Sequence, residues 1–138
     1  MIETGAKQDF DAVREASLHA LPDIETLYVF GSRARGNARV DSDIDLAVLA
    51  KTPIDAARRF EAQREISALL DCDVDLIDLR NASTVLRSEV VNGGTPLFKR
   101  NAQETLAFEA RVLSEYAALL DSTLDLREAI RQRGSIHA

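Results

Sequence analysis

The sequence has 138 residues, of which 46% are apolar and 29% charged, and its 17 basic and 23 acidic side chains give a net charge of −6. This length suits one domain and leaves no room for a second full one, and the acidic balance argues against unselective binding to a phosphate backbone. Cys72 has no second cysteine to pair with, and the longest apolar run, Leu46–Ala50, is far below the about 18 residues of a membrane span. We therefore expect a single domain over residues 1–138 in the reducing cytoplasm.

The first predicted elements are a helix and two strands. Apolar and small residues recur at helical spacing from Asp9, and Pro22 closes that helix. The short β-branched and aromatic segment Leu27–Phe30 runs into Gly31, which is typical of a buried strand that ends in a glycine turn. Ile44–Leu49 is a second strand, interrupted only by one aspartate and one alanine.

The middle of the chain predicts a helix, a strand and a second helix. Pro53 marks the start of a long amphipathic helix that ends near Asp71. Val74–Leu79 follows as a third strand. Asn81 or Ser83 can cap the next helix, because both residue types accept hydrogen bonds from the first helical N–H groups.

The last third predicts a turn at 92–94, an edge strand at 96–99 and one long helix over about 102–133 with a break near Ser122. The tail 134–138 is expected to be disordered. Because strands alternate with helices along the whole chain, the predicted fold class is α/β with α+β-type layering.

The long C-terminal helix carries more apolar residues than one face needs. One face must cover the sheet, and the surplus is a candidate surface for a partner or for a second copy of this chain. The residues concerned are Leu106, Phe108, Val112, Leu119, Leu120, Leu124 and Leu126.

Three aspartates occupy strands that are otherwise apolar. Asp43 and Asp45 stand two residues apart, so both carboxylates leave the same side of the strand about 6.6 Å apart along the backbone. Such a pair repels unless a cation lies between the two groups, and Mg²⁺ binds through carboxylate oxygens. Asp75 interrupts the third strand. If the strands are neighbours, the three carboxylates can hold two metals that assist a displacement at phosphorus.

A glycine turn and several arginines lie next to these aspartates. At Gly31 and Ser32 a strand gives way to a turn, where backbone N–H groups and the Ser32 hydroxyl can bind a phosphate. Arg33, Arg35 and Arg39 can add charge-assisted hydrogen bonds to a triphosphate, although Arg33 and Arg39 fit an ordinary solvated loop equally well. Together these groups favour nucleotidyl transfer from a nucleoside triphosphate.

Each aspartate also has a purely structural interpretation. Asp43 and Asp45 can belong to a solvated turn, because aspartate is common in turns. Asp75 can be an exposed strand residue, as we expect for Asp73 and Asp78 in the same segment. Asp78 is three residues from Asp75, so a regular strand cannot direct both into one site.

The pattern as a whole resembles a known family. Gly31-Ser32, ten intervening residues, Asp43-Ile44-Asp45 and then Asp75 about thirty residues later is similar to the signature of the DNA polymerase β-type nucleotidyltransferase superfamily. The form GSRARG…DSDIDL resembles its minimal nucleotidyltransferase branch, the MntA-type antitoxins paired with HEPN-domain ribonuclease toxins. The resemblance covers about a third of the chain and implies a small mixed sheet packed with helices.

This resemblance also implies roles for the aspartates. Asp43 and Asp45 would be metal ligands, and Asp75 would complete the second Mg²⁺ site and help to activate the acceptor hydroxyl. Members of the branch transfer AMP from ATP to a tyrosine of the partner toxin and so neutralise it. The implied function is therefore that of a protein adenylyltransferase in a type VII-like toxin–antitoxin pair.

For the phosphates, the resemblance implies that Gly31 and Ser32 bind the β- and γ-phosphates, and Arg35 is the best phosphate candidate among the arginines. Two alternatives stay open. The chain could neutralise its partner by forming a complex alone, or it could modify a small molecule such as an aminoglycoside. Small-molecule enzymes of this type usually carry a further substrate domain, and a nucleic-acid polymerase fits poorly with the net charge of −6.

Overall fold

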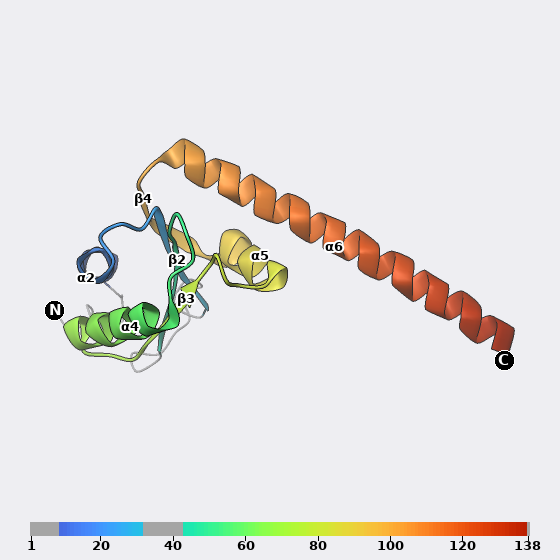
Figure 1. The fold of residues 1–138 in the computed structure, drawn as a ribbon, viewed down its shortest axis with the longest axis horizontal. Coiled ribbons are helices and arrows are strands. Elements are labelled where there is room, and N and C mark those ends of the chain that lie inside the picture. The colour runs from blue at the N-terminus through green and yellow to red at the C-terminus, as the bar shows by residue number, and fades with distance from the viewer. Residues whose placement is uncertain (1–8, 32–42, 138) are drawn as a thin grey trace.

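The computed structural model describes residues 9–31 and 43–137 (Figure 1). Within these residues, strands and helices follow one another in the order that the sequence predicts. The helices are α2 (Phe10–Ala20), α4 (Ala56–Leu70), α5 (Thr84–Gly93) and α6 (Ala102–His137). The strands are β1 (Thr26–Phe30), β2 (Ile44–Leu49), β3 (Val74–Asp78) and β4 (Thr95–Lys99).

The strands form one mixed sheet with the order β3-β2-β1-β4. β1 is antiparallel to both β2 and β4, whereas β2 and β3 are parallel. A parallel pair needs a crossover connection, and α4 supplies it between β2 and β3. The small mixed sheet and the edge position of the last strand are thereby confirmed.

The two faces of the sheet are covered by different helices. Ile44, Leu46 and Val48 of β2 belong to the core under α2 and α4. The alternate residues Ala47 and Leu49 belong to the core formed with α5 and the first turns of α6. Because strand residues alternate between faces, the odd-numbered positions of β2 and β3 point toward the α5 and α6 side.

One helix start differs from the prediction, and the structure decides between the two predicted caps of another helix. α4 begins at Ala56 and not at Pro53, because the Asp55 carboxylate accepts a hydrogen bond from the Arg58 N–H at 2.8 Å and caps the helix. Of the two candidate caps for α5, Ser83 is the one used: its hydroxyl accepts from the Leu86 N–H at 3.1 Å.

The turn predicted at 92–94 is wrong for its first two residues, because α5 continues through Gly93. The helix ends at Gly94, whose N–H donates to the Val90 carbonyl at 2.8 Å. A Cβ at Gly94 would lie 2.6 Å from that same carbonyl oxygen, so the tight end of the helix requires glycine there.

α6 is one helix of 36 residues, about 54 Å long at 1.5 Å per residue. The break predicted near Ser122 is wrong: the neighbouring Thr123 hydroxyl donates to the Leu119 carbonyl at 3.0 Å, which is compatible with a continuous helix. The helix also continues past residue 133 to His137, where we expected a disordered tail. One glycine costs only about 1 kcal/mol in a helix, so it need not end one. Figure 1 shows α6 leaving the sheet and projecting far beyond it.

Candidate functional site

The strand register brings two of the predicted carboxylates side by side. Phe30 of β1 is paired with Asp45 of β2, and Asp45 is paired with Asp75 of β3. Residues paired in this way point to the same face, and neighbouring strands lie about 4.8 Å apart. Asp43 lies one residue before β2. The condition on which the metal prediction depended, that these strands are neighbours, is therefore met.

Gly31, directly after β1, brings the backbone close to this carboxylate row. Its φ is +74°, a conformation that side chains other than glycine rarely adopt. A Cβ at this position would lie 2.3 Å from Oδ2 of Asp45. The missing Cβ thus lets the Asp45 carboxylate lie directly against the Gly31 backbone, which brings the turn and the carboxylate together.

The remaining predicted phosphate ligands cannot be placed. Ser32, Arg33, Arg35 and Arg39 lie outside the described residues. Their predicted roles stay predictions.

The carboxylates at this end of the sheet have few protein partners. Asp43 and Asp75 are exposed and Asp45 is half-buried. Neither Asp43 nor Asp75 makes a side-chain hydrogen bond or ion pair within residues 9–31 and 43–137. No three His, Cys, Asp or Glu side chains in the same ranges are grouped closely enough to hold a metal ion as they stand. The donor set still fits Mg²⁺, which takes carboxylate oxygens and usually keeps waters and substrate phosphates as its other ligands.

An open groove of about 430 Å³ lies beside Asp75. It runs along the outer edge of β3, and its lining includes Arg59, Ile77, Asn81 and Leu86. Because β3 is an edge strand, a second molecule can reach Asp75 from this side. The groove therefore offers an approach for an acceptor to the third carboxylate.

Two side chains of α4 cover part of the free edge of β3, which the sequence did not indicate. Arg59 Nη1 donates to the Leu76 carbonyl at 3.1 Å, and the Leu76 N–H donates to Gln63 Oε1 at 2.9 Å. These bonds satisfy edge groups that could otherwise pair with another strand. The one feature of the sequence that could have suggested them is that both residues lie on the helix that connects β2 to β3.

The expectation that Asp78 is exposed is wrong. Its side chain is 4% exposed, and it accepts hydrogen bonds from the Ile54 N–H at 2.8 Å and from the Arg80 N–H and Asn81 Nδ2 at 3.1 Å. Asp78 therefore connects the end of β3 to the segment that contains Ile54 and to the turn that contains Arg80 and Asn81. The predicted difference in phase between Asp75 and Asp78 is confirmed by their opposite environments.

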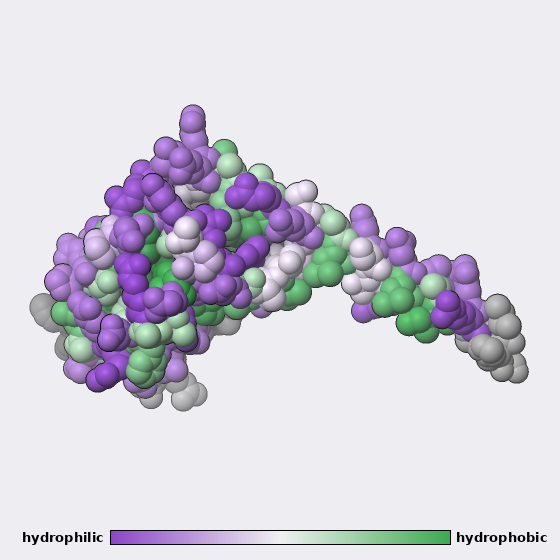
Figure 2. Space-filling view, in the orientation of Figure 1, coloured by the Kyte–Doolittle hydropathy of each residue, from purple (hydrophilic) through white to green (hydrophobic). Residues whose placement is uncertain are grey.

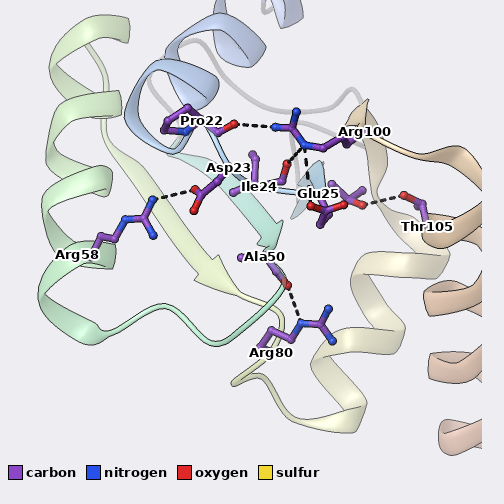
Figure 3. Close-up of polar contacts among 10 residues, drawn as sticks. Pro22, Asp23, Ile24, Glu25, Ala50, Arg58, Arg80, Arg100 and Thr105 are labelled. Carbon is purple, nitrogen blue, oxygen red and sulfur yellow. Dashed lines mark hydrogen bonds and ion pairs between the residues drawn. The ribbon is translucent and has the colours of Figure 1, made fainter.

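The opposite end of the sheet is also charged, and several of its charged side chains are bonded to other protein groups (Figure 3). Arg100 donates from Nε to the Ile24 carbonyl at 3.0 Å and from Nη2 to the Pro22 carbonyl at 2.6 Å. Its Nε also lies 3.9 Å from the Glu25 carboxylate. These contacts tie the segment after β4 to the segment before β1.

Two further arginines complete this end of the sheet. Arg58 forms an ion pair of 2.8 Å with Asp23, and the hydrogen bond from its guanidinium lowers the pKa of the Asp23 carboxyl. Arg80 Nε donates to the Ala50 carbonyl at 2.7 Å. We call the group Asp23, Glu25, Arg58, Arg80 and Arg100 the arginine end, and the group Gly31, Asp43, Asp45 and Asp75 the aspartate end.

Comparison with known proteins identifies the class that this fold and site define. The family model described as "Polymerase beta, Nucleotidyltransferase" matches residues 15–103, which contain all four strands and the whole aspartate end. The chain therefore belongs to the polymerase β nucleotidyltransferase family.

Within that family the chain is similar to particular proteins. It is 36% identical over 120 residues to "Protein adenylyltransferase MntA" of Shewanella oneidensis, a match that covers 83% of this chain and 86% of the relative. Over 114 residues it is 31% identical to a protein of the same name from Aphanizomenon flos-aquae, with 73% of this chain and 76% of the relative covered.

A solved structure agrees with these matches. A chain from a crystal structure of a toxin–antitoxin with AMP-PNP superposes with a TM-score of 0.79 at 33% identity, covering 88% of this chain and 98% of that one.

In this chain, none of the helices over the described residues is long and apolar enough to span a membrane.

Proposed function

We propose that this chain is the antitoxin of a toxin–antitoxin pair and neutralises a HEPN-domain ribonuclease toxin by transferring AMP from ATP to one of its tyrosines. The observation that carries the proposal is the row of Asp45 and Asp75 beside the Gly31 turn. It occurs in a chain 36% identical to a protein adenylyltransferase. A structure described as a tri-AMPylated Shewanella oneidensis HEPN toxin in complex with an MNT antitoxin supports the choice of acceptor: its matched chain has a TM-score of 0.68 at 31% identity, over 94% of this chain and 98% of that one.

ATP is the proposed nucleotide. The AMP-PNP in the similar toxin–antitoxin structure is an ATP analogue and supports this choice. Gly31, Ser32 and Arg35 would hold the β- and γ-phosphates, because backbone N–H groups and a guanidinium both bind phosphate oxygens well. These groups would also retain the pyrophosphate while it leaves.

Asp43, Asp45 and Asp75 would hold the Mg²⁺ ions of this reaction. When bound, divalent ions neutralise the phosphate charge and favour attack at phosphorus. Two of the three carboxylates lie in one row on neighbouring strands, and Asp43 stands two residues before Asp45. Asp43 and Asp75 are exposed, so their carboxylates are accessible to ligands.

In the transfer itself, the acceptor tyrosine oxygen forms a bond to the α-phosphorus and the bond between the α- and β-phosphates breaks, so that pyrophosphate leaves. Asp75 would accept the hydroxyl proton, because a carboxylate within hydrogen-bond reach can act as a general base. Asp75 is exposed and lines the groove at the edge of β3. A tyrosine on another protein could therefore reach it.

The alternative of a binding-only antitoxin has one observation in its favour, the exposed apolar surface of α6. Stable complex formation through that surface could neutralise a partner without chemistry. A cytoplasmic location, expected from the single cysteine, stays a prediction.

The test is incubation of the purified full chain with ATP, Mg²⁺ and the HEPN-domain product of the neighbouring gene, followed by intact mass analysis. We expect the toxin to gain the mass of one or more AMP groups. The double variant Asp43→Asn/Asp45→Asn should add none while still binding the toxin. If the double variant modifies the toxin as fast as the wild type, the catalytic proposal fails. If wild type adds no AMP but still inhibits the toxin, the binding-only function replaces it.

A further inference from the structure

A hollow of about 370 Å³ lies at the end of the sheet away from the aspartates. Its walls include Thr26 and Leu49, which pair at one end of the ladder between β1 and β2, whereas Phe30 and Asp45 pair at the other end. The first turns of α6 close its other side. Ligand pockets in proteins have volumes of about 300–1,000 Å³, so a small molecule fits here. The proposed function leaves this hollow unused.

Three basic side chains from different segments line the hollow. Lys51 lies two residues after β2, Arg80 lies two residues after β3, and Arg111 lies on α6. Because β2 and β3 are parallel neighbours, the segments that follow them leave the sheet at the same end. The fold therefore gathers three cations that are far apart in the sequence, and we call their site the basic hollow.

These cations have donors to spare. Lys51 and Arg111 are exposed and make no side-chain hydrogen bond or ion pair within residues 9–31 and 43–137. Arg80 is half-buried, and its Nε donates to the Ala50 carbonyl at 2.7 Å (Figure 3). The two terminal nitrogens of its guanidinium have no such partner in the same ranges. One bond thus fixes Arg80 and leaves its outer N–H groups available to a ligand.

Two acidic side chains also line the basic hollow, and one of them is already matched. Glu25 is 8% exposed, and its carboxylate lies 3.9 Å from Nε of Arg100, which is not part of the wall. Glu104 is exposed. Three cations thus stand against one acid that no outside arginine offsets. This local excess is opposite in sign to the net charge of −6 of the whole chain, so it favours an anion at this place.

The inner wall of the hollow is apolar or internally satisfied. Leu49 is 4% exposed and Phe108 is 5% exposed. The buried hydroxyls of Thr26 and Thr105 are hydrogen-bonded to each other at 2.8 Å. Figure 2 shows hydrophilic side chains over the body of the molecule beside the first turns of α6. A ligand would therefore find its polar partners among the charged side chains of the rim.

We propose that the basic hollow binds a small molecule through a phosphate group, carried by a nucleotide or by a free polyphosphate. Guanidinium groups donate paired hydrogen bonds to phosphate oxygens, and a lysine adds a compact charge. A phosphate offers several acceptor oxygens, which suits cations that approach from three segments. A neutral ligand would leave these charges unmatched, and a metal cation would be repelled by them. The inference does not depend on the proposed function.

The experiment is a nuclear magnetic resonance titration of the ¹⁵N-labelled full chain with pyrophosphate and, separately, with AMP, both without Mg²⁺. We expect the amide signals of Lys51, Arg80 and Arg111 to shift and to reach saturation. The variant Lys51→Gln/Arg111→Gln should weaken this binding by at least about tenfold, because it removes two charged donors. The control Arg64→Gln/Arg127→Gln removes the same charge from exposed positions outside the hollow and should stay within about twofold of the wild type.

Circular dichroism should find both variants folded like the wild type, because all four substituted side chains are exposed. The signal of Gly31 reports binding at the aspartate end separately. Tighter binding of AMP would identify a nucleotide as the source of the phosphate, and tighter binding of pyrophosphate a free polyphosphate. Signals of the basic hollow that do not shift with either compound would overturn the inference. So would a Lys51→Gln/Arg111→Gln variant that binds as tightly as the control.

Discussion

Both ends of the sheet carry charged groups among the described residues, but the environments of these groups are opposite. At the arginine end, Arg58 is paired with Asp23, and Arg100 is bonded to two carbonyls and lies near Glu25 (Figure 3). At the aspartate end, the Asp43 and Asp75 side chains have no such partner within the described ranges.

This difference distinguishes charged groups that stabilise the fold from candidate ligand-binding groups, and it does so without comparison to any similar protein. Charges that hold a fold together are matched by protein groups, because leaving them unmatched in a partly buried place is unfavourable. Under the proposed function, the exposed carboxylates of Asp43 and Asp75, which have no partner within the described ranges, are matched by ligands instead. The predictions below test that division, from the largest expected effect to the smallest.

Asp75→Ala should separate activity from stability most clearly. We expect AMP transfer to fall by about 10²–10³-fold or more, as when one group that stabilises the transition state is removed. The free energy of unfolding should change by less than about 0.5 kcal/mol, because the exposed side chain has no described partner. Quench-flow or intact-mass time courses and urea unfolding measure the two quantities. A variant that unfolds easily would show that Asp75 is structural after all.

Asp78→Ala on the same strand should show the reverse. The change removes a buried acceptor and leaves the Ile54 and Arg80 N–H groups without their partner. We expect a loss of about 2–4 kcal/mol in the free energy of unfolding. At a temperature where the variant is folded, AMP transfer should stay within about threefold of the wild type. This loss is much smaller than the loss caused by removing a group that stabilises the transition state. An Asp78→Ala variant as stable as wild type contradicts its structural assignment.

Gly31→Ala should damage both properties moderately. The backbone conformation at φ +74° is strained for alanine by about 1–3 kcal/mol, and the new Cβ would collide with Oδ2 of Asp45. Displacement of that carboxylate should lower AMP transfer by about 10²-fold. Gly93→Ala is the matched control, because a Cβ there meets nothing within 4 Å. Equal activity in both variants would argue that the Gly31 turn has no part in the site.

The sequence predicted most of this arrangement, for reasons that can be traced to particular residues. β2 and β3 could be predicted because each is an apolar run interrupted by isolated aspartates. The spacing of three residues between Asp75 and Asp78 already predicted that these two side chains point to opposite faces. Asp78, and not Asp75, is buried because the Ile54 and Arg80 N–H groups donate to its carboxylate. No local sequence pattern predicts these donors. The pairing of Asp45 with Asp75 is likewise a matter of sheet order, which long-range packing decides.

The long helix was misjudged for a similar reason. Ser122 and Thr123 look like a break in a sequence, but the Thr123 hydroxyl bonds to a carbonyl of its own helix. The excess of leucines was correctly seen. Which of them the core covers could not be predicted, and the last buried residue of α6 in the described range is Val112.

Arg58→Met should have the smallest effect. The pair with Asp23 is exposed, so we expect a loss of about 0.2–1 kcal/mol in the free energy of unfolding at pH 7, and less in high salt. The folded-state pKa of Asp23 is lowered, so the contribution is present above the ordinary carboxyl pKa near 3.9 and is lost as the pH falls through the lower folded-state value. Urea unfolding of both proteins from pH 7 to pH 2.5 should therefore show curves that converge at the acidic limit. AMP transfer should be unchanged, because this pair belongs to the end of the sheet away from Asp45 and Asp75. A large loss of transfer with a stable Arg58→Met variant would mean that the arginine end takes part in the reaction, and the division between the two ends would have to be abandoned.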